Sequence, residues 1–408
     1  MSSLNIFDLN DDCLDLLLNY LTSEEQILFA QVCKRFREVF IAWGVKHYRE
    51  FGIDASNTKQ SIIGLSTCRE VVETLIIDMD HFDTARIFRN YGCDEPVICF
   101  NILCYALSGM VNLRRLTVKQ LDYVTTPIKK PFEQIFASVK DLNDLKVLEV
   151  HAKDDWTFDT LWQLHHLEEL QLQIQKIYGE VLVECCKSNP NLRRLQLGYG
   201  IVVGNLCDIV RHCANLETLE FGMMETDFAY KPLSRVPRLR QLIHKGARES
   251  NSLMPLLKAL AVQPQLQQLH IDGGILTPQE ILQIVRQRGL LQLKCFCSTA
   301  ECVEMLAQLI QLQKLSIWVS NGCDISDALL KVIGQCKKLQ LLRIASGNLK
   351  PDFIYNVSKL LLDLRTDTPQ ESLHLELPPS NYTKSIENLS PQTKVLSFSE
   401  FEMSSWKL

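Results

Sequence analysis

Cysteine and histidine are the residues most able to do chemistry in this chain, which contains 15 and 9 of them. Two cysteine pairs are close in sequence, Cys185 with Cys186 and Cys295 with Cys297. A zinc site usually needs a second cysteine pair, or histidines at short spacing. Neither pair has a second pair or a histidine at zinc-finger spacing. We therefore predict no metal site and no cofactor, and we interpret the cysteines as reduced, mostly buried apolar residues.

Catalytic motifs are also missing from the sequence. It contains no Walker loop, no Gly-x-Gly-x-x-Gly, no His-Glu-x-x-His and no Gly-x-Ser-x-Gly. The pair His165-His166 directly precedes an expected strand, and we interpret it as solvated. Nucleophilic catalysis by cysteine needs a thiol activated by a base, and no cysteine shows that local pattern. We predict no catalytic residues and a protein that is not an enzyme.

Charge and hydropathy exclude two classes of partner. The net charge is −5, without the clustered basic residues of a nucleic-acid-binding surface. Residues 1–10 do not resemble a signal peptide, and no apolar stretch approaches the roughly 20 residues that cross a bilayer. The sequence therefore predicts a soluble intracellular protein, cytoplasmic and/or nuclear, that binds neither nucleic acid nor membrane.

The first forty residues predict helices with a surplus of leucine. The acids of Asn10-Asp11-Asp12 favour a helix start, and an apolar stripe follows it at Leu14, Leu17, Leu18 and Leu21. Ser23-Glu24-Glu25-Gln26 fits a capping box, and the helix that it opens carries Leu28, Val32, Phe36 and Phe40 along one face. Two interpretations follow: an N-terminal cap, or a helical surface that completes its burial against a partner.

Residues Leu9 to Phe36 resemble an F-box, most specifically in the closing Val32-Cys33-Lys34-Arg35-Phe36. The sequence departs from that family at Asn10 and Thr22, where proline is usual, and at Gln26, where leucine is usual. Asn and Thr can start helices as caps, so we expect the departures to be tolerated. The resemblance implies binding to the adaptor Skp1, and through it to cullin and RING subunits, with Leu9, Leu14, Leu17, Leu18 and Leu21 as the contact candidates.

From about residue 70 the pattern Leu-x-x-Leu-x-Leu recurs ten times, from Leu113 to Leu339, with weaker copies on both sides. The first leucines from Leu145 onward are 22 to 27 residues apart, inside the period of leucine-rich repeats. Each unit predicts a strand, a turn and a returning helix. Cys213 and Cys336, three residues before their leucines, resemble the cysteine-containing repeats of F-box/LRR proteins.

The expected fold is α/β: a leucine-rich-repeat solenoid, a horseshoe with a parallel sheet inside and helices outside, preceded by a small all-α F-box. We expect the F-box over residues 1–50, a linker or extra helix over 51–66, and about 12 repeats over 67–408. The resemblance implies a substrate-recognition subunit of an SCF-type ubiquitin ligase that binds a target protein. The alternative is a leucine-rich-repeat scaffold whose N-terminal helices act only as a cap.

Side chains alternate along a strand, which predicts the residues of the concave face. Its most distinctive members are Phe296, Trp318 and Leu341 on consecutive strands, with Lys314 and Arg343 beside them. Aromatic side chains and arginine are typical of binding hot spots, so we predict that this patch binds the target. Three explanations stay open: target binding, coverage by residues 345–372 or by the tail Phe401 to Leu408 with Trp406, and a wrong register.

Overall fold

The computed structural model of this 408-residue chain describes residues 5–53, 58–82, 95–120, 128–153, 158–223, 230–246, 251–319, 322–346, 348–364, 372–377 and 396–400. The chain divides into two compact units, Met1–Cys213 and Ala214–Leu408, which are described separately below. In both, parallel strands alternate with helices or 3-10 turns. The α/β repeat fold predicted from the sequence is confirmed.

The first unit opens with a 3-10 turn η1 (Ile6–Asp8) and three helices, α1 (Asp11–Leu18), α2 (Ser23–Val32) and α3 (Lys34–His47). The continuous second helix expected from Leu28 to Phe40 is wrong, because the backbone at Cys33 is extended (φ −158°, ψ 170°) and separates α2 from α3. As a result Phe36 and Phe40 are buried, whereas Leu28 and Val32 are exposed.

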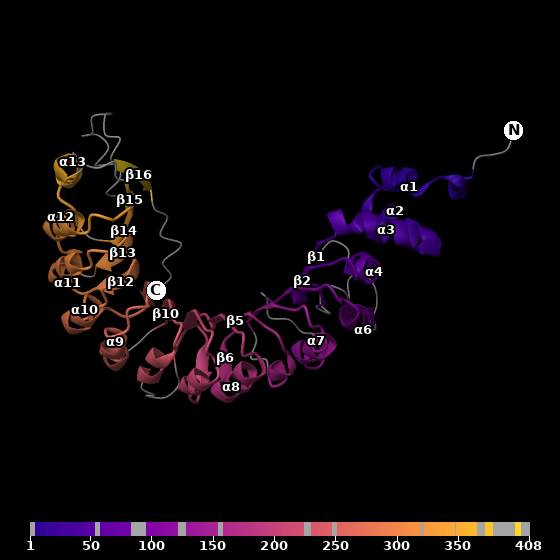
Figure 1. The fold of residues 1–408 in the computed structure, drawn as a ribbon, viewed down its shortest axis with the longest axis horizontal. Helices are drawn as coiled ribbons and strands as arrows, with labels where there is room; N and C mark the ends of the chain where they lie inside the picture. Colours follow the sequence, from indigo (N-terminus) through magenta and orange to yellow (C-terminus); the bar gives the residue numbers. More distant parts are fainter. Residues whose placement is uncertain are drawn as a thin grey trace. The chain divides into compact units, whose positions relative to one another are not determined.

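Six parallel strands follow in the order β1-β2-β3-β4-β5-β7. They are β1 (Glu50–Gly52), β2 (Thr74–Asp78), β3 (Arg115–Gln120), β4 (Val147–Ala152), β5 (Glu169–Gln173) and β7 (Arg194–Gln196). The segments between these strands are α4 (Thr58–Cys68), η2 (Met79–Phe82), α6 (Glu95–Ser108), α7 (Pro131–Val139), η3 (Leu161–Gln163), α8 (Gly179–Ser188) and η4 (Leu206–Arg211). The helices α4, α6, α7 and α8 lie on one side of the sheet (Figure 1). Strands β6 (Lys176–Tyr178) and β8 (Ile201–Val203) form a separate pair. No leucine motif predicts β1, β6 or β8.

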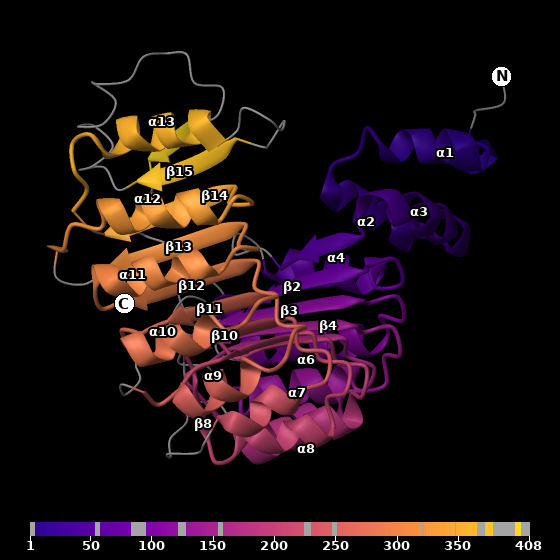
Figure 2. The ribbon, with the colours of Figure 1, turned by 60° about the vertical axis from the view of Figure 1, so that its left-hand side comes forward.

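The second unit has eight parallel strands among its described residues, in sequence order. They are β9 (Thr218–Phe221), β10 (Gln241–Lys245), β11 (Gln268–Asp272), β12 (Gln292–Cys297), β13 (Lys314–Val319), β14 (Leu341–Ser346), β15 (Leu373–Leu377) and β16 (Leu396–Glu400). The returning segments are η5 (Lys231–Arg235), α9 (Met254–Leu260), α10 (Pro278–Ile284), α11 (Ala300–Met305), η6 (Leu306–Gln308), α12 (Ser326–Gln335) and α13 (Phe353–Leu364). These helices line one side of the sheet and leave its other face open (Figures 1 and 2).

The repeat leucines form the core because neighbouring strands pair residue for residue. Leu148 pairs with Leu170, and Leu170 with Leu195, and all three side chains are almost completely buried. A single repeat cannot bury such a row alone, so each strand is stabilised by its two neighbours. All ten Leu-x-x-Leu-x-Leu motifs of the sequence lie on strands of this kind.

In two repeats, a polar side chain three residues before the first leucine bonds to the turn of the preceding repeat. Buried Asn189 accepts a hydrogen bond from the backbone N–H of Leu167 (2.7 Å) and donates to the carbonyl oxygens of Leu164 (2.8 Å) and Cys185 (2.9 Å). At the same position of a later repeat, the thiol of Cys336 donates to the carbonyl oxygen of Leu309 (3.2 Å). These side chains satisfy backbone groups that the turn leaves without partners.

We expect Asn189→Ala to lower the free energy of unfolding by about 2–4 kcal/mol, because it leaves several buried backbone groups without hydrogen bonds. Urea unfolding followed by circular dichroism measures the change. Exposed Asn143 of the same unit provides the matched control, and Asn143→Ala should change the stability little. Equal stability of the two variants would contradict the role given to Asn189.

Candidate partner-binding surfaces

Side-chain caps begin the first two helices where the family usually has proline. The Asn10 side chain accepts from the backbone N–H of Cys13 (2.9 Å) and caps α1. Thr22 caps α2 in a capping box with Glu25, whose carboxylate accepts from the Thr22 N–H (2.8 Å). This hydrogen bond lowers the pKa of Glu25. The expected replacement of proline by Asn and Thr caps is confirmed, but the box begins at Thr22 rather than Ser23.

The third departure, Gln26, closes the turn between α1 and α2. Its buried amide donates to the carbonyl oxygens of Leu18 (2.8 Å) and Leu21 (2.9 Å). Its own oxygen accepts from the hydroxyl of Tyr48 (2.6 Å), which follows α3. Gln26 therefore connects all three helices through hydrogen bonds, which a leucine at this position could not form.

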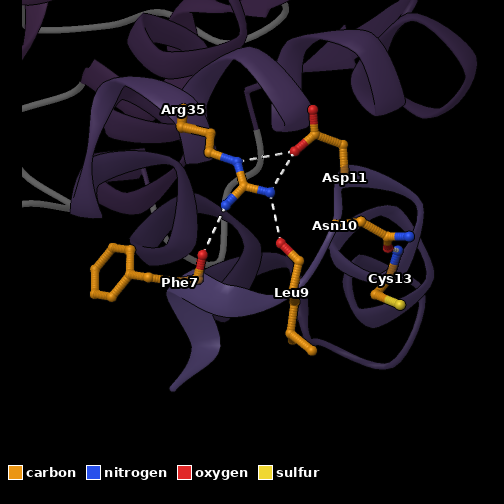
Figure 3. A network of polar contacts seen from close by, with 6 residues as sticks. All are labelled: Phe7, Leu9, Asn10, Asp11, Cys13 and Arg35. Atoms are coloured by element: carbon orange, nitrogen blue, oxygen red, sulfur yellow. Dashed lines mark hydrogen bonds and ion pairs between the residues drawn. The ribbon is translucent and has the colours of Figure 1, made fainter. Parts of the chain in front are cut away.

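Arg35, at the start of α3, holds the segment that precedes α1 (Figure 3). Its guanidinium donates to the Asp11 carboxylate (2.9 and 2.7 Å) and to the carbonyl oxygens of Phe7 (2.9 Å) and Leu9 (2.5 Å). The ring of Phe7 also stacks on Phe36, at 5.3 Å between centroids. The planar guanidinium of Arg35 thus holds Phe7, Leu9 and Asp11, which are distant from it in sequence.

The structure corrects two of the five leucines predicted to contact Skp1. Leu14 and Leu18 are 0% exposed, because they point from α1 into the helical core, where α1 packs on α3. They support the surface and are not available to a partner in this conformation. Leu9, Leu17 and Leu21 are partly exposed, and their contact with Skp1 stays a prediction.

The most exposed apolar side chains of these helices are ones that the sequence analysis did not choose. Leu16 on α1 and Tyr20 in the turn after it are 58% and 81% exposed, and Leu28 and Val32 on α2 are 62% and 57% exposed. Leu28 and Val32 are spaced i, i+4, so they lie on the same side of α2. The i, i+4 spacing can be read from the sequence, but it does not predict which face of the helix is buried. We call these four residues the F-box apolar surface.

The predicted target patch lies on the open face of the second unit, the sheet face opposite the helices. Phe296 pairs with Trp318 across β12 and β13, and their rings are 5.4 Å apart. Leu341, however, pairs with Lys314 at the other end of β13, about 13 Å along the strand from Trp318 at ~3.3 Å per residue. The expected apolar patch of Phe296, Trp318 and Leu341 is therefore wrong. Parallel strands bring together residues at equivalent repeat positions, and Leu341 lies at an earlier position of its repeat than Phe296 and Trp318 do.

The side chains of the patch differ in availability. Phe296 is only 3% exposed and supports Trp318, which is partly exposed. Arg343 forms an ion pair with Glu376 of the next strand, whereas Lys314 is exposed. Binding of the target by these residues stays a prediction. The tail from Phe401, including Trp406, lies outside the described residues.

A model of the F-box domain matches residues 6–41. The chain begins with an F-box. F-boxes generally bind Skp1 and bring a substrate adaptor into an SCF ubiquitin ligase, and leucine-rich repeats bind proteins. This chain thus combines an F-box with leucine-rich repeats, an arrangement that is typical of non-catalytic adaptors.

Solved structures similar to the chain include an internalin from Listeria monocytogenes (14% identity, TM-score 0.42, 82% of this chain and 95% of that chain). A leucine-rich-repeat protein of Leptospira interrogans also matches, with 15% identity and a TM-score of 0.36, over 79% of this chain and 97% of that chain. Internalin C2 of Listeria monocytogenes matches with 15% identity and a TM-score of 0.34, over 61% of this chain and 92% of that chain. With TM-scores this low, the repeat assignment rests on the strands and leucines described above. No curated protein matches the chain in sequence.

Two buried cysteines of the repeats lie in surroundings that oppose thiolate chemistry. Burial raises the pKa of the Cys185 and Cys336 thiols to about 12, so both are protonated near neutral pH and are poor nucleophiles. No cluster of three or more metal-binding side chains occurs in the described part of the chain. Within the same residues, no helix is both long and apolar enough to cross a bilayer.

We expect Arg35→Ala to release the segment before α1, because four hydrogen bonds from one guanidinium are lost together. Hydrogen–deuterium exchange should become at least about tenfold faster at the backbone N–H groups of residues 6–10, a change near 1.4 kcal/mol. The control is Lys34→Ala, which removes only an exposed ion pair with Glu38. Unchanged exchange in the Arg35 variant would show that other contacts hold the segment.

Proposed function

We propose that this chain is the substrate-recognition subunit of an SCF-type ubiquitin ligase. Its F-box binds Skp1, which connects it to the cullin and RING subunits, and the open face of its repeats binds a target protein. The chain itself contributes proximity: it raises the effective concentration of target lysines near the loaded ubiquitin carrier. We propose the cytoplasm, the nucleus or both as its location.

The observation that carries the proposal is the F-box apolar surface. Leu16, Tyr20, Leu28 and Val32 are each more than half exposed. They lie on or next to α1 and α2, which turn Leu14 and Leu18, and Phe29 and Ala30, into the core. At ~25 cal/mol per Å² of apolar area, burial of such side chains against a partner is strongly favourable. Apolar side chains grouped in this way typically mark an interaction site.

The alternative, a scaffold that uses the F-box only as a cap, is favoured by one contact. Helix α2 packs on α4. The contact is close at Gly64, where a Cβ atom would lie only 2.9 Å from the side chain of Ile27. This contact would cover the first repeat with or without a partner. A cap alone, however, gives no reason for the exposed leucines of α1 and α2.

We expect the double variant Leu16→Asp/Leu28→Asp to reduce co-purification with Skp1 at least about tenfold, because two charges would have to be desolvated in the interface. Far-ultraviolet circular dichroism should stay unchanged, since both side chains are exposed. The matched control is Val262→Asp in the second unit, where the apolar side chain is 82% exposed and Skp1 binding should not change. Equal recovery of Skp1 by both variants would leave the cap as the better explanation.

We expect Trp318→Ala to remove most target capture and to leave Skp1 binding intact, because a partly exposed ring on the open face is lost. Quantitative mass spectrometry of co-purified proteins, with the cullin ligase inhibited, measures the effect. The control is Trp162→Ala on η3, among the helices of the first unit, where the ring is also exposed. The same set of captured proteins in both variants would contradict target binding at Trp318.

A further inference from the structure

The open face of the second unit is rich in charge but nearly neutral. Its described strands present four cations (Lys245, Lys294, Lys314 and Arg343) and three anions (Glu220, Asp272 and Glu376), which leaves a formal difference of one positive charge (4 − 3 = 1). The signs are mixed: anions lie on β9, β11 and β15, and cations lie on β10 and on the three consecutive strands β12, β13 and β14. Whether those three cations form a region that attracts a highly charged ligand depends on their ion pairs.

Three of the four cations are already paired across strands. Lys245 lies 2.8 Å from Glu220, Lys294 lies 2.9 Å from Asp272, and Arg343 contacts Glu376. The anions are only 5%, 12% and 15% exposed, so each pair is largely screened from water by the protein and is broken at a high cost. Lys314 is the exposed cation of this set, with no ion pair to a described residue.

The first unit, taken separately, repeats the same arrangement. On its open face Arg115 contacts Glu149, and Arg194 lies 3.0 Å from Glu169. Cross-strand ion pairs therefore occur on the described open face of both units.

Recognition of a phosphorylated segment needs the opposite arrangement. A phosphate carries about −1.5 to −2 charges, and phosphate-binding surfaces offer it several cations with free N–H groups. Here Lys245, Lys294 and Arg343 donate to carboxylates, and a phosphate placed between them would lie beside Glu220, Asp272 or Glu376. Like-charge repulsion and the lost ion pairs would both oppose its binding.

Uncharged hydrogen-bonding groups dominate another row of the same face. Gln241, Gln268 and Gln292 pair in register across β10, β11 and β12, and Lys314 is next in the row. An amide side chain has both donors and an acceptor, which suits the N–H and C=O groups of a peptide main chain, although the Gln241 oxygen already accepts from the Thr218 hydroxyl (3.3 Å). Lys314 begins β13, and the ring of Trp318 lies about 13 Å further along that strand at ~3.3 Å per residue.

We infer that the open face of the second unit binds an unphosphorylated peptide segment of its target, so that target capture needs no phosphorylation; this rests on the proposed function. The segment contacts the glutamine row through its main chain and Trp318 through an apolar side chain. Lys314 accommodates a single carboxylate. Phosphorylation of a residue in the segment weakens binding.

Two immobilised libraries of random peptides, identical except for a central serine or phosphoserine, test this with the full-length chain. We expect the serine library to retain the chain at least about tenfold better than the phosphoserine library, which corresponds to 1.4 kcal/mol. Trp318→Ala should abolish retention on the serine library. A wild-type preference for phosphoserine would overturn the inference while leaving target binding by the open face in place.

A charge-release variant provides the matched comparison. Glu220→Gln/Asp272→Asn/Glu376→Gln frees three cations without changing side-chain size, and its retention on the phosphoserine library should rise about tenfold. If the triple variant does not fold, Glu376→Gln alone, which frees Arg343, should show a smaller rise. No rise in a folded variant would contradict the explanation by charge pairing. Retention of the wild type on neither library would count against both this inference and target binding by the face.

Discussion

In-register pairing of parallel strands is the constraint on which this structure depends. It places Leu148 beside Leu170 and Leu170 beside Leu195, so that each repeat buries its leucines only with the help of its neighbours. The same register determines which side chains meet on the open face. Phe296 meets Trp318, and Leu341 meets Lys314, because they occupy equivalent repeat positions. Core and binding surface therefore follow from one set of backbone hydrogen bonds.

The F-box shows how hydrogen bonds replace residues that the family usually has. Asn10 and Thr22 start helices in place of proline, and Gln26 ties α1, α2 and Tyr48 together in place of leucine. Arg35 adds the segment before α1. These polar contacts stabilise the small helical domain. The exposed leucines Leu16 and Leu28 are therefore not needed for its core.

The two surfaces are suited to different kinds of recognition. The F-box apolar surface offers mostly hydrophobic area, which favours a stable partner present in every complex. The open face offers paired charges, glutamine amides and a ring, which favours specificity for shape and hydrogen bonding over net charge. The proposed function, which combines one constant partner with selected target proteins, needs this division.

Periodicity determined the repeat fold and the strands that carry the leucine motifs, because leucine spacing is a local signal. The F-box was recognised from the resemblance of Leu9 to Phe36 to that family, and the caps at Asn10 and Thr22 are local signals too. Periodicity did not determine which of the leucines from 9 to 21 face a partner, since Leu14 and Leu18 are buried by packing of α1 on α3. Nor did it reveal that Leu341 is far from Trp318, or that Arg343 is held by Glu376. These depend on contacts between residues distant in sequence, which only the tertiary structure decides.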